Sequence, residues 1–194
     1  MTEGRWLGND IWLHDPTKTT IFGIPIQQKW TDLVIFEKIF NQEKLSCVIE
    51  AGTYQAGLSL YLWMHCFQRE IEFYTFDMRR PNDEYLQSRL ATNLWLEGHC
   101  FQENVFDPVG TMFLTLKNHQ KHPMLVLCDG GDKVSEFRTF PHYLLSGDII
   151  GVHDWNWEIR TTNVEKTVEK LNLSPYLEAE CMRIESMWRF WRLL

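Results

Sequence analysis

Five short apolar, β-prone runs recur along the chain, at residues 47–50, 73–77, 99–106, 124–129 and 148–154. Each run starts about 25 residues after the previous one, which leaves room for one helix between consecutive strands. This spacing is typical of the β-α-β units of a parallel sheet. The runs are nearly continuous in apolar residues, as expected for strands buried on both faces. The pattern predicts an α/β fold with a Rossmann-like, doubly wound, mostly parallel sheet.

The stretches around these runs carry apolar residues at helical spacing. We expect a helix before the first run, with Leu33, Phe36 and Phe40 facing inward, and helices on both faces of the sheet. The helical positions in the later stretches are Leu86, Leu90 and Leu94, then Val109, Met112, Phe113 and Leu116, and finally Val164, Val168 and Leu171.

The pattern changes towards the C-terminus. Residues 177–181, Leu-Glu-Ala-Glu-Cys, alternate as a half-buried strand does, and we expect the final SMWRFWRLL to pair antiparallel beside them. The chain shows no internal repeat or linker, so we predict a single domain over residues 1–194. Its expected parts are an N-terminal lid and helix at 1–45, a cofactor-binding core at 46–160, and a C-terminal helix and strands at 161–194.

Composition and charge narrow the classes of function. The chain has 194 residues, 44% of them hydrophobic, which is enough for one core but marginal for two domains. Its formal charge of -7 lacks the basic footprint that nucleic-acid binding needs. The N-terminus MTEGRWLGND has no signal-peptide pattern, and no apolar run approaches the ~20 residues of a membrane span. We therefore expect no nucleic-acid or membrane partner.

The cysteines indicate the redox compartment. They are odd in number, widely spread and without a C-x-x-C pair: Cys47, Cys66, Cys100, Cys128 and Cys181. We expect buried, reduced thiols and a cytoplasmic location.

Candidate chemistry begins with the carboxylates at the ends of the runs, Glu50, Asp77, Asp129 and Asp154. The carboxyl ends of parallel strands line the ligand crevice of an open α/β sheet, so we expect all four along one edge. Any one of them could instead cap the following helix or stay solvated.

The loop VIEAGTYQAGLS, residues 48–59, limits the choice of ligand. It has Leu58 where a P-loop has its phosphate-binding lysine, and Glu50 would repel a polyphosphate. Glu50 also replaces the first glycine of the dinucleotide fingerprint G-x-G-x-x-G, which disfavours an NAD-dependent oxidoreductase but leaves it as an alternative. A carboxylate there suits a cationic ligand, and Asp77 suits a ribose diol. S-adenosylmethionine carries an amino group, a sulfonium and a ribose, and no phosphate.

Five segments follow one another in order: GIPIQQKWTDL, VIEAGTYQAGLS, FYTFD, LCDGGDK and IIGVHDW. With these segments the sequence resembles class I S-adenosylmethionine-dependent methyltransferases. Within them it resembles the family that includes cephalosporin hydroxylase-like proteins and rhamnosyl O-methyltransferases. The resemblance runs over residues 23–155, most of the chain, and implies methyl transfer.

The resemblance implies roles for the loop. Glu50 and the backbone around Gly52, Thr53 and Tyr54 would hold the methionine part of S-adenosylmethionine. Gly57 would let the loop approach the ligand, and residues 26–28 would fold over the donor methyl as part of a lid.

The same resemblance implies further cofactor contacts. Ser59 would cap near the carboxylate, and Asp77 would take the ribose hydroxyls. Asn104 would contact the adenine edge, with Glu103 as an equal candidate one residue away. Asp129 is also among the residues that would bind the cofactor.

Methyl transfer to oxygen also needs a way to remove the acceptor's proton, and two routes are open. In the first, Asp129, His153 and Asp154 bind a divalent ion that lowers the acceptor's pKa. His153 stands where the family commonly has a carboxylate, and this mixed set favours Mn²⁺ over Mg²⁺. In the second, no metal binds, and the catalytic residues are Asp129, His153 or Asp132, where many relatives have histidine.

We therefore expect an S-adenosylmethionine-dependent O-methyltransferase that acts on a small hydroxylated acceptor, a sugar or a secondary metabolite. The alternative from another class is a catalytically inactive S-adenosylmethionine- or nucleoside-binding protein. The sequence does not fix the oligomeric state, although the aromatic tail SMWRFWRLL could cover the surface of a neighbouring copy.

Overall fold

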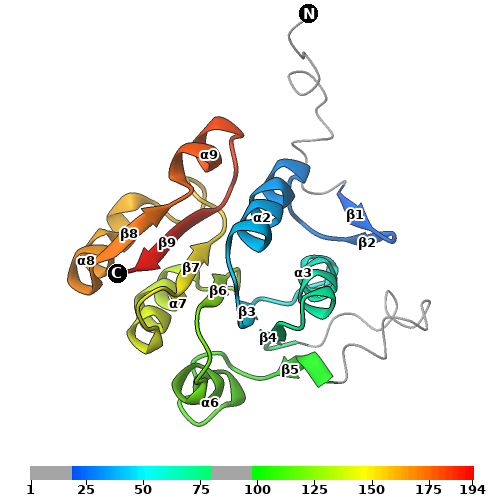
Figure 1. Cartoon of the computed structure of the whole chain (residues 1–194), viewed down its shortest axis with the longest axis horizontal. Helices are drawn as coiled ribbons and strands as arrows, with labels where there is room; N and C mark the ends of the chain where they lie inside the picture. The colour runs from blue at the N-terminus through cyan, green and yellow to red at the C-terminus, as the bar shows by residue number, and fades with distance from the viewer. Residues whose placement is uncertain (1–18, 80–97) are drawn as a thin grey trace, which may run out of the picture.

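The computed structural model describes residues 19–79 and 98–194. Five parallel strands form most of its larger sheet: β3 (Cys47–Ala51), β4 (Glu72–Asp77), β5 (Cys100–Gln102), β6 (Met124–Cys128) and β7 (Ile149–Val152). The antiparallel strand β9 (Arg189–Leu193) lies between β7 and β8 (Leu173–Tyr176). The strand order is β5-β4-β3-β6-β7-β9-β8 (Figure 1). The predicted parallel sheet and antiparallel C-terminal strand pair are both confirmed.

Helices cover both faces of this sheet, as predicted (Figure 1). One face carries α2 (Trp30–Gln42), α3 (Gly57–Gln68) and α9 (Glu178–Arg183), and the other carries α6 (Thr111–Asn118), α7 (Lys133–Thr139), the 3₁₀ turn η2 (Phe140–Tyr143) and α8 (Thr161–Leu171). Two short strands, β1 (Thr20–Ile21) and β2 (Ile24–Pro25), form a separate hairpin before α2.

Burial on both faces explains the continuous apolar runs. Val48 and Ile49 are neighbours in β3, and both are fully buried. Because successive strand side chains point to opposite faces, Val48 joins the core under α2 and α3, and Ile49 joins the core under α6 and α7. A strand between two helical layers therefore needs an apolar residue at nearly every position.

Several predicted helices have the expected inward faces. Leu33, Phe36 and Phe40 of α2 are buried, and so are Met112, Phe113 and Leu116 of α6. Val109 is an exception, because it precedes α6 and is 76% exposed. In α8, Val164 is buried while Val168 and Leu171 pack at the edge of the core. The prediction for Leu86, Leu90 and Leu94 lies outside the described residues.

The prediction of a strand at residues 177–181 is wrong. Leu177 is the N-cap of α9, and the strand that pairs with β9 lies earlier, at β8. Leu177 and Cys181 are four residues apart, so the same letters also fit one face of a helix, and Cys181 is the buried residue of α9. The predicted run 99–106 likewise forms only the three residues of β5.

The aromatic tail packs inside the chain. Trp188, Phe190 and Trp191 are buried, and β9 pairs on both sides. These aromatic side chains therefore pack within the chain, and a homo-oligomer stays a prediction. None of the five cysteines, which all lie in the described residues, forms a disulfide, and all but the half-buried Cys100 are buried. No helix in the described ranges is long and apolar enough to cross a membrane.

Candidate functional site

The strand order reverses between β3 and β6, which is the position where open α/β sheets bind ligands. Gly52 follows β3 and Asp129 follows β6, and the two touch. A Cβ on Gly52 would lie 2.2 Å from the Asp129 carbonyl oxygen, and Gly52 has φ +103°. Both the space and the backbone conformation therefore require glycine here.

Glu50 lies in β3 just before this contact and is fully buried. Its Oε2 accepts hydrogen bonds from the Ser59 hydroxyl and, at 2.6 Å, from Thr75 Oγ1. Its Oε1 is buried and has no hydrogen-bond partner among the described residues. Burial raises the pKa of Glu50 to about 8, although the two hydroxyls lower it. Among the described residues, no cation pairs with this carboxylate.

The loop after Glu50 is held in a rarely populated backbone conformation. Tyr54 and Ala56 have φ of 46° and 64°, in the left-handed region. The loop is fixed by the Tyr54 amide, which donates to Asp77 Oδ2 at 2.8 Å, and by a 2.7 Å hydrogen bond between the hydroxyls of Thr53 and Thr75. Such conformations concentrate at ligand sites. Sequence reasoning missed Gln55, whose Oε1 is buried without a partner among the described residues.

Asp77 ends β4 and is half-buried. Its two carboxylate oxygens accept from the amides of Tyr54 and Arg79, at 2.8 and 2.9 Å. It therefore ties the loop after β3 to the end of β4, and a carboxylate oxygen can accept a further hydrogen bond.

The structure separates the two candidates for the adenine edge. Glu103 accepts from the amides of Thr111 and Met112, at 2.9 and 2.6 Å, so its side chain caps α6. Asn104 is exposed and accepts from the Phe106 amide at 3.0 Å. Glu103 thus has a structural role of its own.

Gly57 and Ser59 lie in the first turn of α3 and have contacts that the resemblance did not imply. A Cβ on Gly57 would lie 2.1 Å from the Pro25 carbonyl oxygen, so this glycine lets α3 pack on the segment before α2. Ser59 is buried and donates to Glu50 instead of capping a helix.

Asp129, His153 and Asp154 come together, as predicted from their places at the ends of β6 and β7. One ligand atom from each lies within 4.8 Å of the others. His153 Nδ1 lies 2.9 Å from Asp129 Oδ1 and 3.4 Å from Asp154 Oδ1. Asp154 has φ 57°, a left-handed conformation that aspartate tolerates better than most residues.

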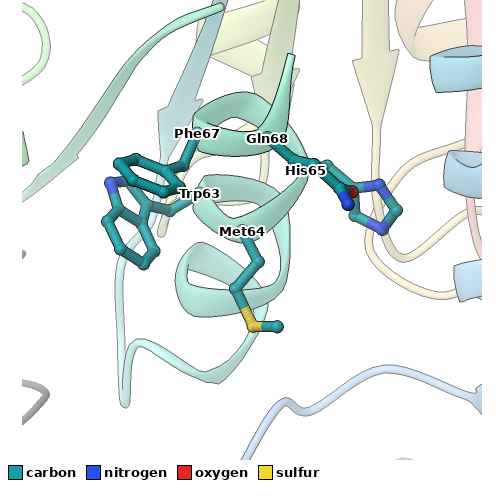
Figure 2. Close-up of a pocket in the computed structure, with 5 residues that line it drawn as sticks. All are labelled: Trp63, Met64, His65, Phe67 and Gln68. Atoms are coloured by element: carbon teal, nitrogen blue, oxygen red, sulfur yellow. The ribbon is translucent and has the colours of Figure 1, made fainter. Parts of the chain in front are cut away.

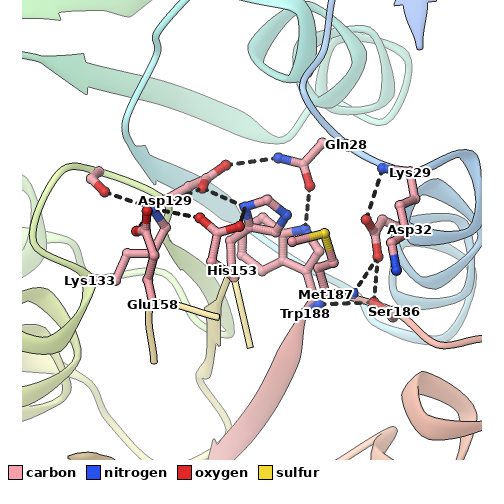
Figure 3. A network of polar contacts seen from close by, with 12 residues as sticks. Gln28, Lys29, Asp32, Asp129, Lys133, His153, Glu158, Ser186, Met187 and Trp188 are labelled. Carbon is pink, nitrogen blue, oxygen red and sulfur yellow. Dashed lines mark hydrogen bonds and ion pairs between the residues drawn. The ribbon is translucent and has the colours of Figure 1, made fainter. Parts of the chain in front are cut away.

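A fourth charged group, Lys133, lies among them (Figure 3). Its Nζ is 2.9 Å from Asp154 Oδ2, 2.9 Å from Glu158 Oε2 and 3.8 Å from Asp129 Oδ1. It also donates to the Gly130 carbonyl at 3.0 Å. The only sequence signal was its position four residues after Asp129, because Asp154 and Glu158 reach it only through the fold.

Burial alone would lower the pKa of His153, but Asp129 and Asp154 raise it to about 10. At neutral pH the imidazole is then protonated, so it is a poor proton acceptor. Asp132 is the exposed N-cap of α7 and accepts from the Ser135 amide at 3.0 Å, which lowers its pKa. Of the three predicted catalytic residues, Asp129 is the one that directly follows β6, where the strand order reverses.

The segment before α2 crosses this cluster. Gln28 is buried, donates to Asp129 Oδ2 at 2.9 Å, and accepts from Trp188 Nε1 at 2.8 Å (Figure 3). The buried carboxylate of Asp32 accepts from the Ser186 hydroxyl at 2.6 Å and the Met187 amide at 2.9 Å. The N-terminal segment and the segment before β9 are thereby joined over the acidic cluster.

A hollow of about 430 Å³ lies elsewhere, along the C-terminal half of α3 (Figure 2). It is lined by Trp63, Met64, His65, Phe67 and Gln68. A helix that follows a parallel strand runs back towards the amino end of the sheet, so this hollow lies away from the acidic cluster. We do not place the functional site there.

The comparisons with known proteins agree with the fold. No model of a protein family matches the chain, and no curated protein matches its sequence. The CmcI apo-structure matches with a TM-score of 0.66 and 13% identity, over 100% of this chain and 88% of that one. A CmcI structure described as Mg-SAM has a TM-score of 0.64 and 12% identity, over 92% and 78%. A third, described as SAH, has a TM-score of 0.59 and 13% identity, over 92% and 84%. The chain thus has the Rossmann-like fold of these CmcI structures, and fold alone does not assign an activity.

Proposed function

We propose that the chain is an S-adenosylmethionine-dependent methyltransferase that methylates an oxygen of a small hydroxylated acceptor, a sugar or a secondary metabolite. The observation that carries the proposal is the buried Oε1 of Glu50, which has no partner among the described residues. Glu50 lies in β3, beside β6, where the strand order of the sheet reverses. An amino group is the kind of ligand cation that would complete it. The CmcI structures with a similar fold, described as Mg-SAM and SAH, support the choice of donor.

Several residues would hold this donor. Glu50 and the backbone of Gly52, Thr53 and Tyr54 would bind its methionine part, and Asp77 its ribose hydroxyls. The Tyr54–Asp77 hydrogen bond joins these two groups of contacts. Asn104 is our candidate for the adenine edge, because Glu103 caps α6.

S-adenosylmethionine, when bound, supplies an electrophilic methyl group on a sulfonium. The protein then has two tasks, to align the acceptor oxygen with that methyl group and to accept the oxygen's proton. We assign the proton to Asp129, at the end of β6. His153 and Gln28 hold this carboxylate in place, with contacts of 2.9 Å to each of its two oxygens.

Methyl transfer tests the proposal. We would incubate the protein with methyl-labelled S-adenosylmethionine and a panel of sugars and phenolic metabolites, and measure transferred label and released S-adenosylhomocysteine. Transfer to at least one acceptor, abolished by Asp129→Asn, is the expected result. Binding of NADH in place of S-adenosylmethionine would contradict the proposal.

A second candidate is a nucleoside-binding protein without catalysis. It is favoured by the contacts of two predicted bases, since Asp132 caps α7 and the buried His153 directs its Nδ1 at two carboxylates. Donor binding without turnover on a broad panel of acceptors would support it.

A further inference from the structure

We propose that the ammonium group of Lys133 serves as the resident cation of the Asp129, His153 and Asp154 cluster, in the place of a divalent metal ion. The three residues are close enough to hold one ion. In an empty metal site the ligand atoms surround open space, whereas here the ammonium group of Lys133 already lies among the three residues. The inference deepens the proposed function by naming the cation of the same site.

Each N–H donor of the Lys133 ammonium group has an oxygen atom of the chain within hydrogen-bonding distance. An ammonium group has three N–H donors. Lys133 Nζ lies at 2.9 to 3.0 Å from three oxygens, those of Asp154, Glu158 and Gly130. Its side chain is only 8% exposed. These three oxygens hold the ammonium group of Lys133 in place beside Asp129, His153 and Asp154.

The carboxylate oxygens that would bind a metal ion already face N–H groups. Asp129 Oδ2 accepts from Gln28, and Asp129 Oδ1 faces His153 Nδ1 at 2.9 Å. Asp154 Oδ2 faces Lys133, and Asp154 Oδ1 faces the same His153 nitrogen at 3.4 Å. A divalent ion would have to displace these contacts and lie next to the positive charge of Lys133.

The ring nitrogens of His153 are also not oriented as those of a metal ligand would be. Its Nδ1 points at two carboxylates, so this nitrogen carries the hydrogen and has no lone pair for a metal ion. Its Nε2 is buried without a hydrogen-bond partner in the described part of the chain, and its ring centroid lies 5.0 Å from that of Trp188. As arranged, the cluster does not fit a divalent ion. Lys133 is therefore a positioning residue, which holds Asp129 and Asp154 by charge.

Titration with Mn²⁺ alone, followed by electron paramagnetic resonance of the free ion, tests this directly. The proteins are the wild type, Lys133→Met, Lys133→Arg and Asp154→Asn. Lys38→Met is the matched control, because it removes a surface ion pair with Glu180 far from the cluster in sequence. Lys133→Met keeps the length of the side chain and removes its charge, whereas Lys133→Arg keeps the charge.

We expect the wild type, Lys133→Arg and Lys38→Met to bind Mn²⁺ no more tightly than Asp154→Asn does. Lys133→Met should bind one Mn²⁺ at least tenfold more tightly than the wild type. One Mn²⁺ bound by the wild type and lost in Asp154→Asn would overturn the inference, and so would a folded Lys133→Met without any gain. Circular dichroism checks folding, and if Lys133→Met does not fold, the wild type and Asp154→Asn decide the question.

The metal titration contains neither donor nor acceptor, so its outcome is independent of the proposed activity. S-adenosylmethionine binding is measured separately by calorimetry. A protein that binds neither Mn²⁺ nor the donor would refute the proposed function alone. A wild type that binds both would refute the role of Lys133 alone.

Discussion

Gln28 and Asp129, which are 101 residues apart in the chain, are joined by a 2.9 Å hydrogen bond between the Gln28 amide nitrogen and Asp129 Oδ2. The amide oxygen of the same Gln28 accepts from Trp188. One buried side chain therefore connects the segment before α2, the end of β6 and the segment before β9. This arrangement makes the position of Asp129 depend on the N-terminal segment.

Gln28→Leu should lower the free energy of unfolding by roughly 1–3 kcal/mol, because it leaves the buried Trp188 N–H without its acceptor. It should also reduce methyl transfer, since Asp129 loses the hydrogen bond to its Oδ2 that helps to fix it. Urea denaturation measures the first effect. Gln42→Leu, on the exposed end of α2, is the control and should change stability little. A Gln28→Leu protein as stable as this control would contradict the role of the link.

Gly52→Ala should destabilise the protein by about 3 kcal/mol or more, because the added Cβ meets the Asp129 backbone and the residue keeps a positive φ. Gly131→Ala is the matched control, since its Cβ would meet no atom within 4 Å and its φ lies outside the left-handed range. Thermal unfolding of both variants measures the difference. Equal losses would mean that the β3–β6 contact is not as close as described.

Glu50 should make stability depend on pH. Burial raises its pKa from 4.5 to about 8, so between these values the folded state holds a proton that the unfolded state has lost. Folding stability from this group therefore falls as pH rises from about 4.5 to about 8, and stays low above that range. Glu50→Gln removes the titration. Relative to the wild type it should gain stability across this range and then level off.

Urea denaturation of both proteins at intervals between pH 5 and pH 9 gives the difference curve. A difference that does not change with pH would show that Glu50 titrates normally. Calorimetry of the same pair provides a second readout, because the glutamine amide cannot form an ion pair with the amino group of S-adenosylmethionine and should weaken its binding.

Asp77→Ala should weaken S-adenosylmethionine binding roughly tenfold or more, since hydrogen bonds to charged groups contribute about 1.5–3 kcal/mol. The loss has two sources, the ribose contact and the Tyr54 amide that Asp77 holds. Asp107→Ala is the control, because Asp107 accepts from the Val109 amide in the turn before α6. Unchanged affinity in Asp77→Ala would refute the ribose assignment.

The sheet and the helices were predictable because the central strands β3, β6 and β7 are buried on both faces and the helices pack against the sheet on one. A continuous apolar run, such as the one around Ile49 in β3, then indicates a buried strand. Apolar residues at helical spacing, such as those around Phe36 in α2, indicate a helix. The C-terminal region was harder, since Leu177 and Cys181 fit both alternation and a helical turn. Pro175 lies within β8 and is untypical of a strand, although an edge strand such as β8 tolerates proline.

The carboxylates of the site were predictable from topology, because Glu50, Asp77 and Asp129 all stand at the carboxyl ends of parallel strands. Lys133 was not, since its partners Asp154 and Glu158 come from the segment after β7. Only the register of β6 against β7 brings these residues to the lysine. Ion pairs between residues of different loops leave no periodic pattern in the sequence.

Calorimetric titration of the wild-type protein with S-adenosylmethionine tests the central claim most directly. We predict binding of one donor per chain, competition by S-adenosylhomocysteine, and weaker binding in Glu50→Gln and Asp77→Ala. No binding of S-adenosylmethionine, or tight binding of NADH to the same protein, would contradict the account.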